Sequence, residues 1–188
     1  YTVQPMGRGS FGSNMLIAST WRHGQEMKRI GKGNADRRWD VLPQQPALAY
    51  DIAQNRLIVT AAVLQAPVFD VSAGDAALFG SYGALVGHEL TRGFDNSGRR
   101  VDARGEVRDW WTPADITAWN ALGERLAQQF SGYAYPGLAN AKVNGKLTQE
   151  ANLADLSGVE LAWDAYSNEQ AAPTADARKT LFRSWSQL

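Results

Sequence analysis

The chain has 188 residues and no cysteine, and its 19 Lys and Arg side chains balance 19 Asp and Glu side chains. This length predicts one ordinary domain, and the balanced charge excludes a net field that would draw the protein to nucleic acid or to an anionic membrane. The absence of cysteine excludes disulfides, thiol catalysis and cysteine-ligated zinc. Two histidines are too few for a metal site built mainly of histidine. We recognise neither a signal peptide nor a membrane segment in the sequence.

The first helices and strands along the chain are predicted from helix-capping residues and from the Gly and Pro residues that interrupt regular structure. Residues 1–12 are rich in Gly and Ser and are expected to be poorly ordered, so the predicted domain covers residues 13–188. A helix is predicted from Ser13 or Asn14 to about Ile30. A polar connector over residues 32–45 follows, and then two strands at 47–50 and 56–60 around a turn.

The next helix is predicted from a start at Ser72, with Asp75 three residues on, to about Phe94. Three glycines in it are spaced three and four apart, which predicts close packing of another element on this helix. These glycines are Gly80, Gly83 and Gly87.

The second half of the chain combines a region of turns with three predicted helices. Residues 95–111 are polar and predict turns and a short hairpin. The sequence Thr112-Pro113-Ala114-Asp115 is a strong helix start, and the helix is expected to end at Gly132. Helices are also predicted after Thr148 and after Thr174. The predicted fold class is therefore α+β, mainly helical, with a small β hairpin.

One short segment carries recognisable chemistry. Zinc peptidases use H-E-x-x-H because helical residues four apart share a face, so that two imidazoles reach one metal. Here Gly87-His88-Glu89-Leu90-Thr91-Arg92 keeps the first histidine and the glutamate but has arginine at the second ligand position. Arginine stays protonated and offers a cation no lone pair.

Several motifs around this segment resemble those of the neprilysin-like zinc metallopeptidases. The family's zinc helix, G-H-E-I/L-T-H-G-F-D, is similar to residues 87–95, and its D-W-W-T stands intact at 109–112. Its N-G-x-x-T-x-G-E-N-I/L-A-D segment is similar to residues 144–155. The resemblance runs from about Asn14 to Leu188 and implies a zincin-like catalytic-domain core. Family members are several times longer, so the chain is interpreted as a fragment or a reduced relative.

The resemblance assigns the family's functional positions one by one. It implies that His88 is the first zinc ligand, that Glu89 is the catalytic glutamate and that Asp155 orients the histidine. The second ligand position falls on Arg92. The third falls on Ala151, because Asn152-Leu153-Ala154-Asp155 fixes the register. Glu150 is one residue away, and one helical step turns a side chain by about 100°.

The substrate side of the resemblance is altered as well. The family's N-A-F/Y-Y edge strand falls on Ala47-Leu48-Ala49-Tyr50, so the side-chain amide that would hold a peptide is missing. The backbone at Ala47 and Leu48 remains a candidate for pairing with an extended peptide. The resemblance places the family's transition-state histidine and substrate-binding arginine beyond the E-N-I/L-A-D helix, and neither can be assigned here, because no histidine follows His88 in the sequence.

These replacements lead to one interpretation and one alternative. We expect a metallopeptidase-family domain that has lost zinc binding and peptide hydrolysis, with no cofactor and with a residual role in binding a peptide or protein. The guanidinium of Arg92 is predicted to take the metal's place, to neutralise Glu89 and Asp155, and to pair with Glu150. The alternative is an active zinc endopeptidase with Glu89 as general base, in which water, Glu89 or a displaced Glu150 completes the zinc shell.

The remaining expectations concern partners and other candidate sites. A missing portion of a longer protein or an oligomeric partner is a possible completion of the site, and the resemblance implies a location outside the cytoplasm. Asp95-Asn96-Ser97-Gly98 predicts a turn rather than a calcium loop, since the closing glutamate is missing. Four arginines between residues 99 and 108 alternate with acids and predict a mixed-charge surface. Trp110 and Trp111 are expected to pack rather than to form a sugar platform.

Overall fold

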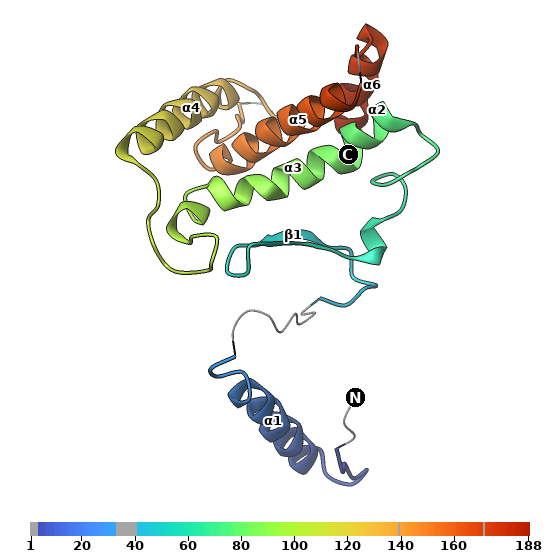
Figure 1. Cartoon of the computed structure of the whole chain (residues 1–188), viewed down its shortest axis with the longest axis vertical. Helices are drawn as coiled ribbons and strands as arrows, with labels where there is room; N and C mark the ends of the chain where they lie inside the picture. The colour runs from blue at the N-terminus through green and yellow to red at the C-terminus, as the bar shows by residue number, and fades with distance from the viewer. Residues whose placement is uncertain (1–3, 33–40, 139, 171) are drawn as a thin grey trace. The chain divides into compact units, whose positions relative to one another are not determined.

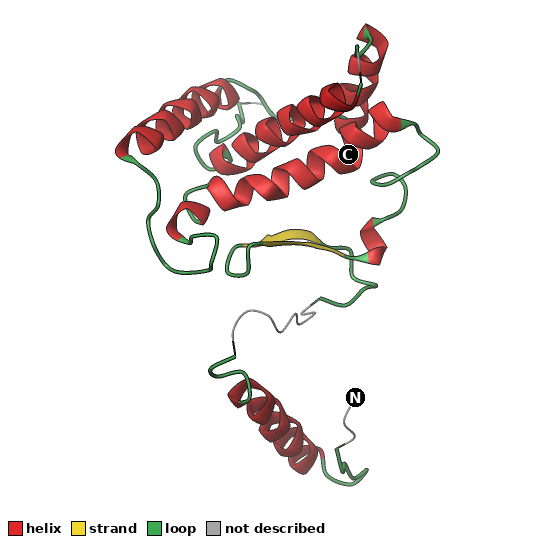
Figure 2. Ribbon diagram, viewed as in Figure 1, coloured by secondary structure: helices red, strands yellow, loops and turns green. Residues whose placement is uncertain are grey.

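The computed structural model describes residues 4–32, 41–138, 140–170 and 172–188. The chain divides into two compact units, Tyr1–Asp40 and Val41–Leu188, whereas the sequence analysis placed one domain over residues 13–188. Residues 1–3 of the segment expected to be poorly ordered, and residues 33–40 of the predicted connector, lie outside the described residues. Most of the described elements are helical, with one two-stranded hairpin (Figure 2).

The first unit contains helix α1, Phe11–Met27. Its N-cap is Ser10, whose hydroxyl oxygen accepts a hydrogen bond from the backbone N–H of Ser13 at 3.3 Å. The predicted caps, Ser13 and Asn14, are wrong because this bond already closes the first turn, and Asn14 instead donates its side-chain amide to the carbonyl of Gly7 at 2.6 Å. The helix therefore begins inside the segment expected to be poorly ordered.

The second unit opens with the predicted hairpin. Strands β1, Leu48–Asp51, and β2, Arg56–Val59, pair antiparallel with Leu48 opposite Val59 and Asp51 opposite Arg56. The ion pair between Arg56 Nε and Asp51 Oδ2, at 3.2 Å, lies next to the turn. Both strands are confirmed, although Ala47 falls just before β1.

A nearly continuous helical stretch follows the hairpin and carries the zinc-helix motif (Figure 1). A short 3-10 turn at Ala61–Val63 precedes it. The stretch consists of α2, Asp75–Leu78, a π-helical turn, Phe79–Gly83, then α3, Ala84–Thr91, and a 3-10 turn, Arg92–Phe94. The predicted end is confirmed. The predicted cap Ser72 is wrong, because Ser72 bonds to Asp70 and the N-cap is Gly74 with φ 83°.

Close approach of two helices fixes the centre of this unit. Helix α5, Gln149–Glu169, crosses α3 where glycine faces glycine. A Cβ on Gly87 would lie 2.7 Å from the carbonyl oxygen of Gly158, and a Cβ on Gly158 would lie 2.6 Å from the backbone nitrogen of His88. The predicted close packing is confirmed at Gly87 and also at Gly80, where a Cβ would meet the Leu181 carbonyl at 2.1 Å. Ala84, Val159 and Ala162 form the buried cluster at the crossing.

The remaining helices complete this unit. Helix α4, Pro113–Ser131, begins with the predicted capping box of Thr112 and Asp115, and α6, Ala175–Trp185, begins at the predicted cap Thr174. The loop between α3 and α4 contains a 3-10 turn at Gly98–Arg100 and an isolated bridge between Val101 and Val107, as the predicted turns and hairpin require. Among the described helices, none is both long and apolar enough to cross a bilayer.

Candidate functional site

The α3–α5 crossing brings His88 and Asp155 together. His88 directly follows Gly87, and Asp155 lies three residues before Gly158, so the close contact of the two backbones places the two side chains across from each other. His88 Nδ1 and Asp155 Oδ1 are 2.6 Å apart. The imidazole is 17% exposed and the carboxylate 47%, so the pair lies at the edge of the packed interior.

Arg92 faces the other nitrogen of the same ring. Its guanidinium nitrogen Nη2 lies 3.5 Å from His88 Nε2. Because arginine can only donate, this bond needs the Nε2 lone pair, which leaves the ring proton on Nδ1 for Asp155. The lone pair that a metal would need at Nε2 is therefore directed at a cation.

The carboxylate partner of Arg92 differs from the prediction. Its Nη1 lies 3.6 Å from Asp95 Oδ2, and the Asp95 side chain is only 8% exposed. Oδ1 of Asp95 accepts the backbone N–H groups of Ser97 and Gly98 at 2.8 Å each, which confirms the predicted turn. Of the three carboxylates predicted for Arg92, Glu89 bonds to Tyr50, Asp155 bonds to His88, and Glu150 accepts a bond from Asn96 at 2.7 Å.

Glu89 is turned toward the hairpin. Its Oε2 accepts the backbone N–H of Tyr50 at 3.0 Å, and its Oε1 is 3.9 Å from His88 Nε2. Tyr50 is itself held in place, since its hydroxyl donates to Asn55 Oδ1. Burial raises the pKa of the Tyr50 phenol, and the nearby Asp51 charge adds to the rise.

The donor set does not fit a catalytic zinc centre, which has three protein ligands. Ala151 is an exposed residue in the first turn of α5 and has no donor atom. In the part of the chain that the structure describes, no group of three or more His, Cys, Asp or Glu side chains is arranged to hold a metal ion.

The two residues predicted on the substrate side lie on the hairpin. Ala47 donates its N–H to Thr60 Oγ1 at 2.9 Å and accepts the N–H of Thr60 at 3.0 Å. In an antiparallel pair the hydrogen-bonded positions alternate, so the backbone groups of Leu48 and Tyr50 point away from β2. Leu48 therefore presents its backbone at the free edge, and the Tyr50 N–H at the same edge is bonded to Glu89.

Sequence reasoning missed three partners in this site: Tyr50, Asp95 and Asn96. A spacing of three residues puts Asp95 within reach of Arg92 on one helical face, and that signal was available in the sequence. The contacts of Tyr50 with Glu89 and of Asn96 with Glu150 span 39 and 54 residues, so no local sequence pattern predicts them.

The helical stretch, the crossing helix and the hairpin edge together define a zincin-like metallopeptidase core. The fold is similar to that of the Mycobacterium tuberculosis zinc metalloprotease Zmp1 solved with an inhibitor, with a TM-score of 0.75 and 30% identity. That comparison covers 94% of this chain and 28% of Zmp1.

The model of peptidase family M13 matches residues 49–188, and this chain belongs to that family. It is 32% identical to Neprilysin-3 of Drosophila melanogaster over 169 residues, which cover 90% of this chain and 21% of the relative. It is 36% identical to the neutral endopeptidase of Lactobacillus helveticus over 138 residues, covering 73% and 21% of the two chains. The chain thus spans about a fifth of the length of these curated relatives.

Proposed function

We propose that this chain is an M13-family domain that neither holds catalytic zinc nor hydrolyses peptides, and that its β1 edge binds an extended peptide or protein segment. The observation that carries the proposal is the guanidinium of Arg92 at His88 Nε2, 3.5 Å away. A permanent cation at this nitrogen repels a dication and competes for the same lone pair. Ala151 removes a further donor atom. Among the described residues, His88 is therefore not part of any group of three or more side chains that could hold a metal ion.

The alternative, an active zinc endopeptidase, has one observation in its favour. The bond of 2.6 Å between His88 Nδ1 and Asp155 is the arrangement that orients a metal-binding imidazole. The same bond also holds a histidine that only pairs with Arg92. It supports both functions, and the experiment below separates them.

The peptide-binding part of the proposal is supported by the hairpin edge. An unpaired strand edge accepts an extended segment through main-chain hydrogen bonds. The N–H and C=O groups of Leu48 point to this edge, while the N–H of Tyr50 is engaged by Glu89. A bound segment therefore pairs first at Leu48 and must displace Glu89 to reach Tyr50.

The proposal also covers where the protein is located and which further polypeptide completes the site. The resemblance to neprilysin-like enzymes favours a place outside the cytoplasm. Because the chain spans about a fifth of its curated relatives, we also propose that further polypeptide, from a longer chain or from a partner, lies against the site.

Zinc stoichiometry tests the loss of the metal. The purified chain is loaded with zinc, dialysed and analysed by elemental mass spectrometry beside an Arg92→His, Ala151→Glu double variant. We expect almost no zinc in the parent and about one equivalent in the double variant, which is removed again by His88→Ala. Arg125→His, on the exposed face of α4, is the matched control for an added surface histidine.

One tightly held zinc in the parent that disappears in the His88→Ala variant would overturn the proposal and establish the endopeptidase. Cleavage of a fluorogenic peptide by the zinc-loaded parent, absent in Glu89→Gln, would have the same meaning. Circular dichroism of each variant shows that the helices are intact.

A further inference from the structure

A pocket of about 350 Å³ opens at the end of β1, away from the His88 ring. It lies between the turn of the hairpin, the 3-10 turn that follows α3 and the loop that leads to α4. This volume is at the lower end of the range for small organic ligands, so it suits one side chain rather than a folded segment. We call it the Trp110 pocket; its lining includes Tyr50, Phe94, Asp102, Ala103, Arg108 and Trp110.

Three aromatic rings form its walls, and each is held in place. Phe94 and Trp110 pack edge to face, with ring centres 5.9 Å apart. The indole N–H of Trp110 donates to the carbonyls of Gly98 and Val101 at 3.3 and 3.2 Å. The Tyr50 ring lies so close to Gly93 that a Cβ there would be 3.1 Å from its hydroxyl oxygen. Rings fixed in this way receive another ring at little entropic cost.

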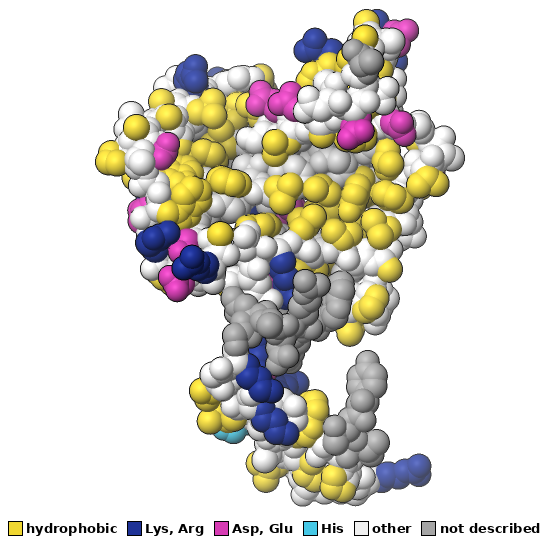
Figure 3. Space-filling view, viewed as in Figure 1, with side chains coloured by type: hydrophobic (Ala, Val, Ile, Leu, Met, Phe, Trp, Pro, Cys, Tyr) yellow, Lys and Arg dark blue, Asp and Glu magenta, His cyan; other side chains and the backbone are white. Residues whose placement is uncertain are grey.

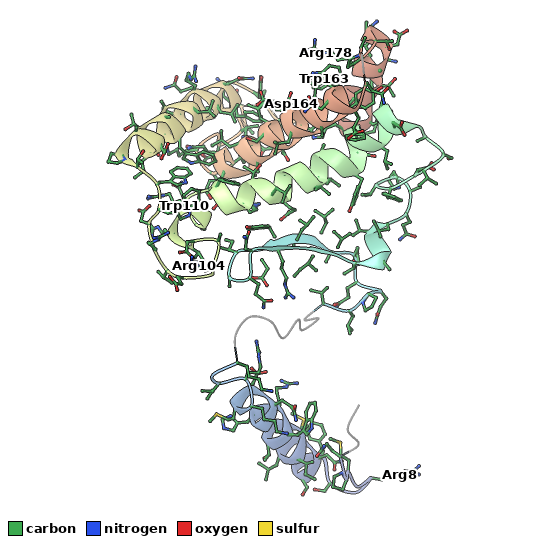
Figure 4. The ribbon with its side chains drawn as sticks, viewed as in Figure 1. Arg8, Arg104, Trp110, Trp163, Asp164 and Arg178 are labelled. Atoms are coloured by element: carbon green, nitrogen blue, oxygen red, sulfur yellow. The ribbon has the colours of Figure 1, made fainter. Side chains whose placement is uncertain are left out.

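A cation stands beside these rings. Figure 4 labels Trp110 and Arg104 on the loop between α3 and α4, the loop that also carries Arg108. The Arg108 side chain is 67% exposed, and its Nη2 lies 3.4 Å from Asp102 Oδ2. Figure 3 shows basic and acidic side chains together over this part of the surface.

Asp102 leaves most of the Arg108 guanidinium free. Its Oδ1 already accepts the backbone N–H groups of Arg104 and Glu106 at 2.9 and 3.1 Å. These hydrogen bonds, above all the one from the backbone of Arg104, lower the pKa of the Asp102 carboxyl. Arginine has five N–H donors, and a loose contact with one carboxylate oxygen leaves several of them for a ligand anion.

We propose that the Trp110 pocket binds the C-terminal aromatic residue of a peptide: the ring enters between Tyr50, Phe94 and Trp110, and Arg108 pairs with the terminal carboxylate. Two observations favour a peptide over an isolated aromatic acid. The pocket shares Tyr50 with the β1 edge, and Leu48, two residues before Tyr50 on that edge, turns its backbone groups away from β2 and so offers them to a preceding residue of the same peptide. The choice of a peptide rests on the proposed function of the β1 edge, whereas binding of the ring and the carboxylate in the pocket requires neither the loss of zinc nor pairing with Leu48.

The test uses a small probe of known chemistry. N-acetyl-L-phenylalanine carries the ring and the carboxylate of a C-terminal residue, N-acetyl-L-phenylalaninamide lacks only the charge, and N-acetyl-L-alanine lacks only the ring. Ligand-observed NMR titrations measure the dissociation constant of each with the whole chain. We expect the acid to bind about tenfold more tightly than the amide, since hydrogen bonds to charged groups are the strong ones, and the alanine compound not to bind.

Two variants and two matched controls assign the residues. Arg108→Gln is expected to abolish the difference between acid and amide, while Arg104→Gln, on the same loop but outside the pocket lining, preserves it. Ala103→Trp fills the pocket and is expected to abolish binding of both probes. Ala118→Trp, in the neighbouring pocket behind Trp110, leaves binding unchanged.

The inference is overturned if the acid and the amide bind the parent equally, if Arg108→Gln keeps the preference for the acid, or if the filled pocket binds as the parent does. Failure to bind N-acetyl-L-phenylalanine at all also overturns it. None of these results bears on zinc content or on pairing at Leu48, so failure of this inference and failure of the proposed function are distinguishable.

Discussion

On its Nδ1 side the His88 ring meets the Asp155 carboxylate at 2.6 Å, whereas on its Nε2 side it meets the Arg92 guanidinium at 3.5 Å. The first contact follows from the backbone, because the glycine crossing of α3 and α5 sets where Asp155 lies. The second follows from the side chain at one position, which a substitution changes without moving a helix. Packing therefore preserves the geometry around Nδ1, while the chemistry at Nε2 changes freely.

The largest effect is expected from a substitution that forces α3 and α5 apart and so displaces Asp155 from His88. In Gly158→Ala the new Cβ would lie 2.5 Å from the Ala84 carbonyl and 2.6 Å from the His88 nitrogen, both backbone atoms that cannot rotate away. We expect a loss of about 3 kcal/mol in the free energy of unfolding, as overpacked interiors show. Urea unfolding followed by circular dichroism measures it.

The control for this variant is Gly83→Ala, on the same helical stretch. A Cβ at Gly83 would have its closest contacts at 3.7 Å, which is ordinary packing distance. Its unfolding free energy should change by less than about 1 kcal/mol. Equal losses in the two variants would show that the crossing is not the constraint we describe.

The next largest effect is expected from changing the partner of His88 Nδ1. In the Arg92→His, Ala151→Glu background, Asp155→Asn keeps a hydrogen-bond acceptor but removes the charge that orients and polarises His88. We expect zinc affinity to fall by about 10- to 100-fold, the usual effect of changing such a partner. Competition with a chelating dye measures the affinity, and Asp164→Asn, farther along α5, serves as the control. An unchanged affinity would mean that Asp155 only packs against the ring.

The smallest expected effect concerns Glu89. Glu89→Ala frees the Tyr50 N–H for a peptide, and one hydrogen bond no longer has to be displaced. We expect a labelled hexapeptide of alternating valine and threonine to bind about fivefold more tightly, equivalent to about 1 kcal/mol. Fluorescence anisotropy measures the affinity. Glu150→Ala is the control, because it removes another carboxylate near the site but leaves the Tyr50 N–H bonded to Glu89. An equal gain in peptide affinity in this control would contradict the role of Glu89.

Much of the fold could be predicted because its signals are local. Thr112 with Asp115, and Thr174, marked the helix starts that the structure has, since a cap is a contact within one turn. The spacing of Gly80, Gly83 and Gly87 predicted close packing, which the structure has at Gly80 and Gly87 but not at Gly83, where a Cβ would have its closest contacts at 3.7 Å. Burial is less local: Leu122 in α4 and Leu156 in α5 are apolar residues of well-formed helices, yet they are 37% and 41% exposed.

The candidate site could be predicted only in its positions and not in its contacts. The motif placed His88, Glu89 and Arg92 on one turn, and the Asn152–Asp155 register put Ala151 at the third position. Which carboxylate Arg92 meets depends on side-chain rotamers and on the path of the chain after α3. For that reason Asp95 took the place that the sequence analysis gave to Glu150.

Tyr50 contributes its backbone to the β1 edge and its ring to the Trp110 pocket. Any coupling between these two proposed sites is reciprocal: whatever occupancy of the pocket does to affinity at the edge, occupancy of the edge does to affinity in the pocket by the same factor. A single peptide that reaches both gains further, because its second contact forms at a high effective concentration. For a peptide that fits both proposed sites, avidity within one chain would be the source of selectivity.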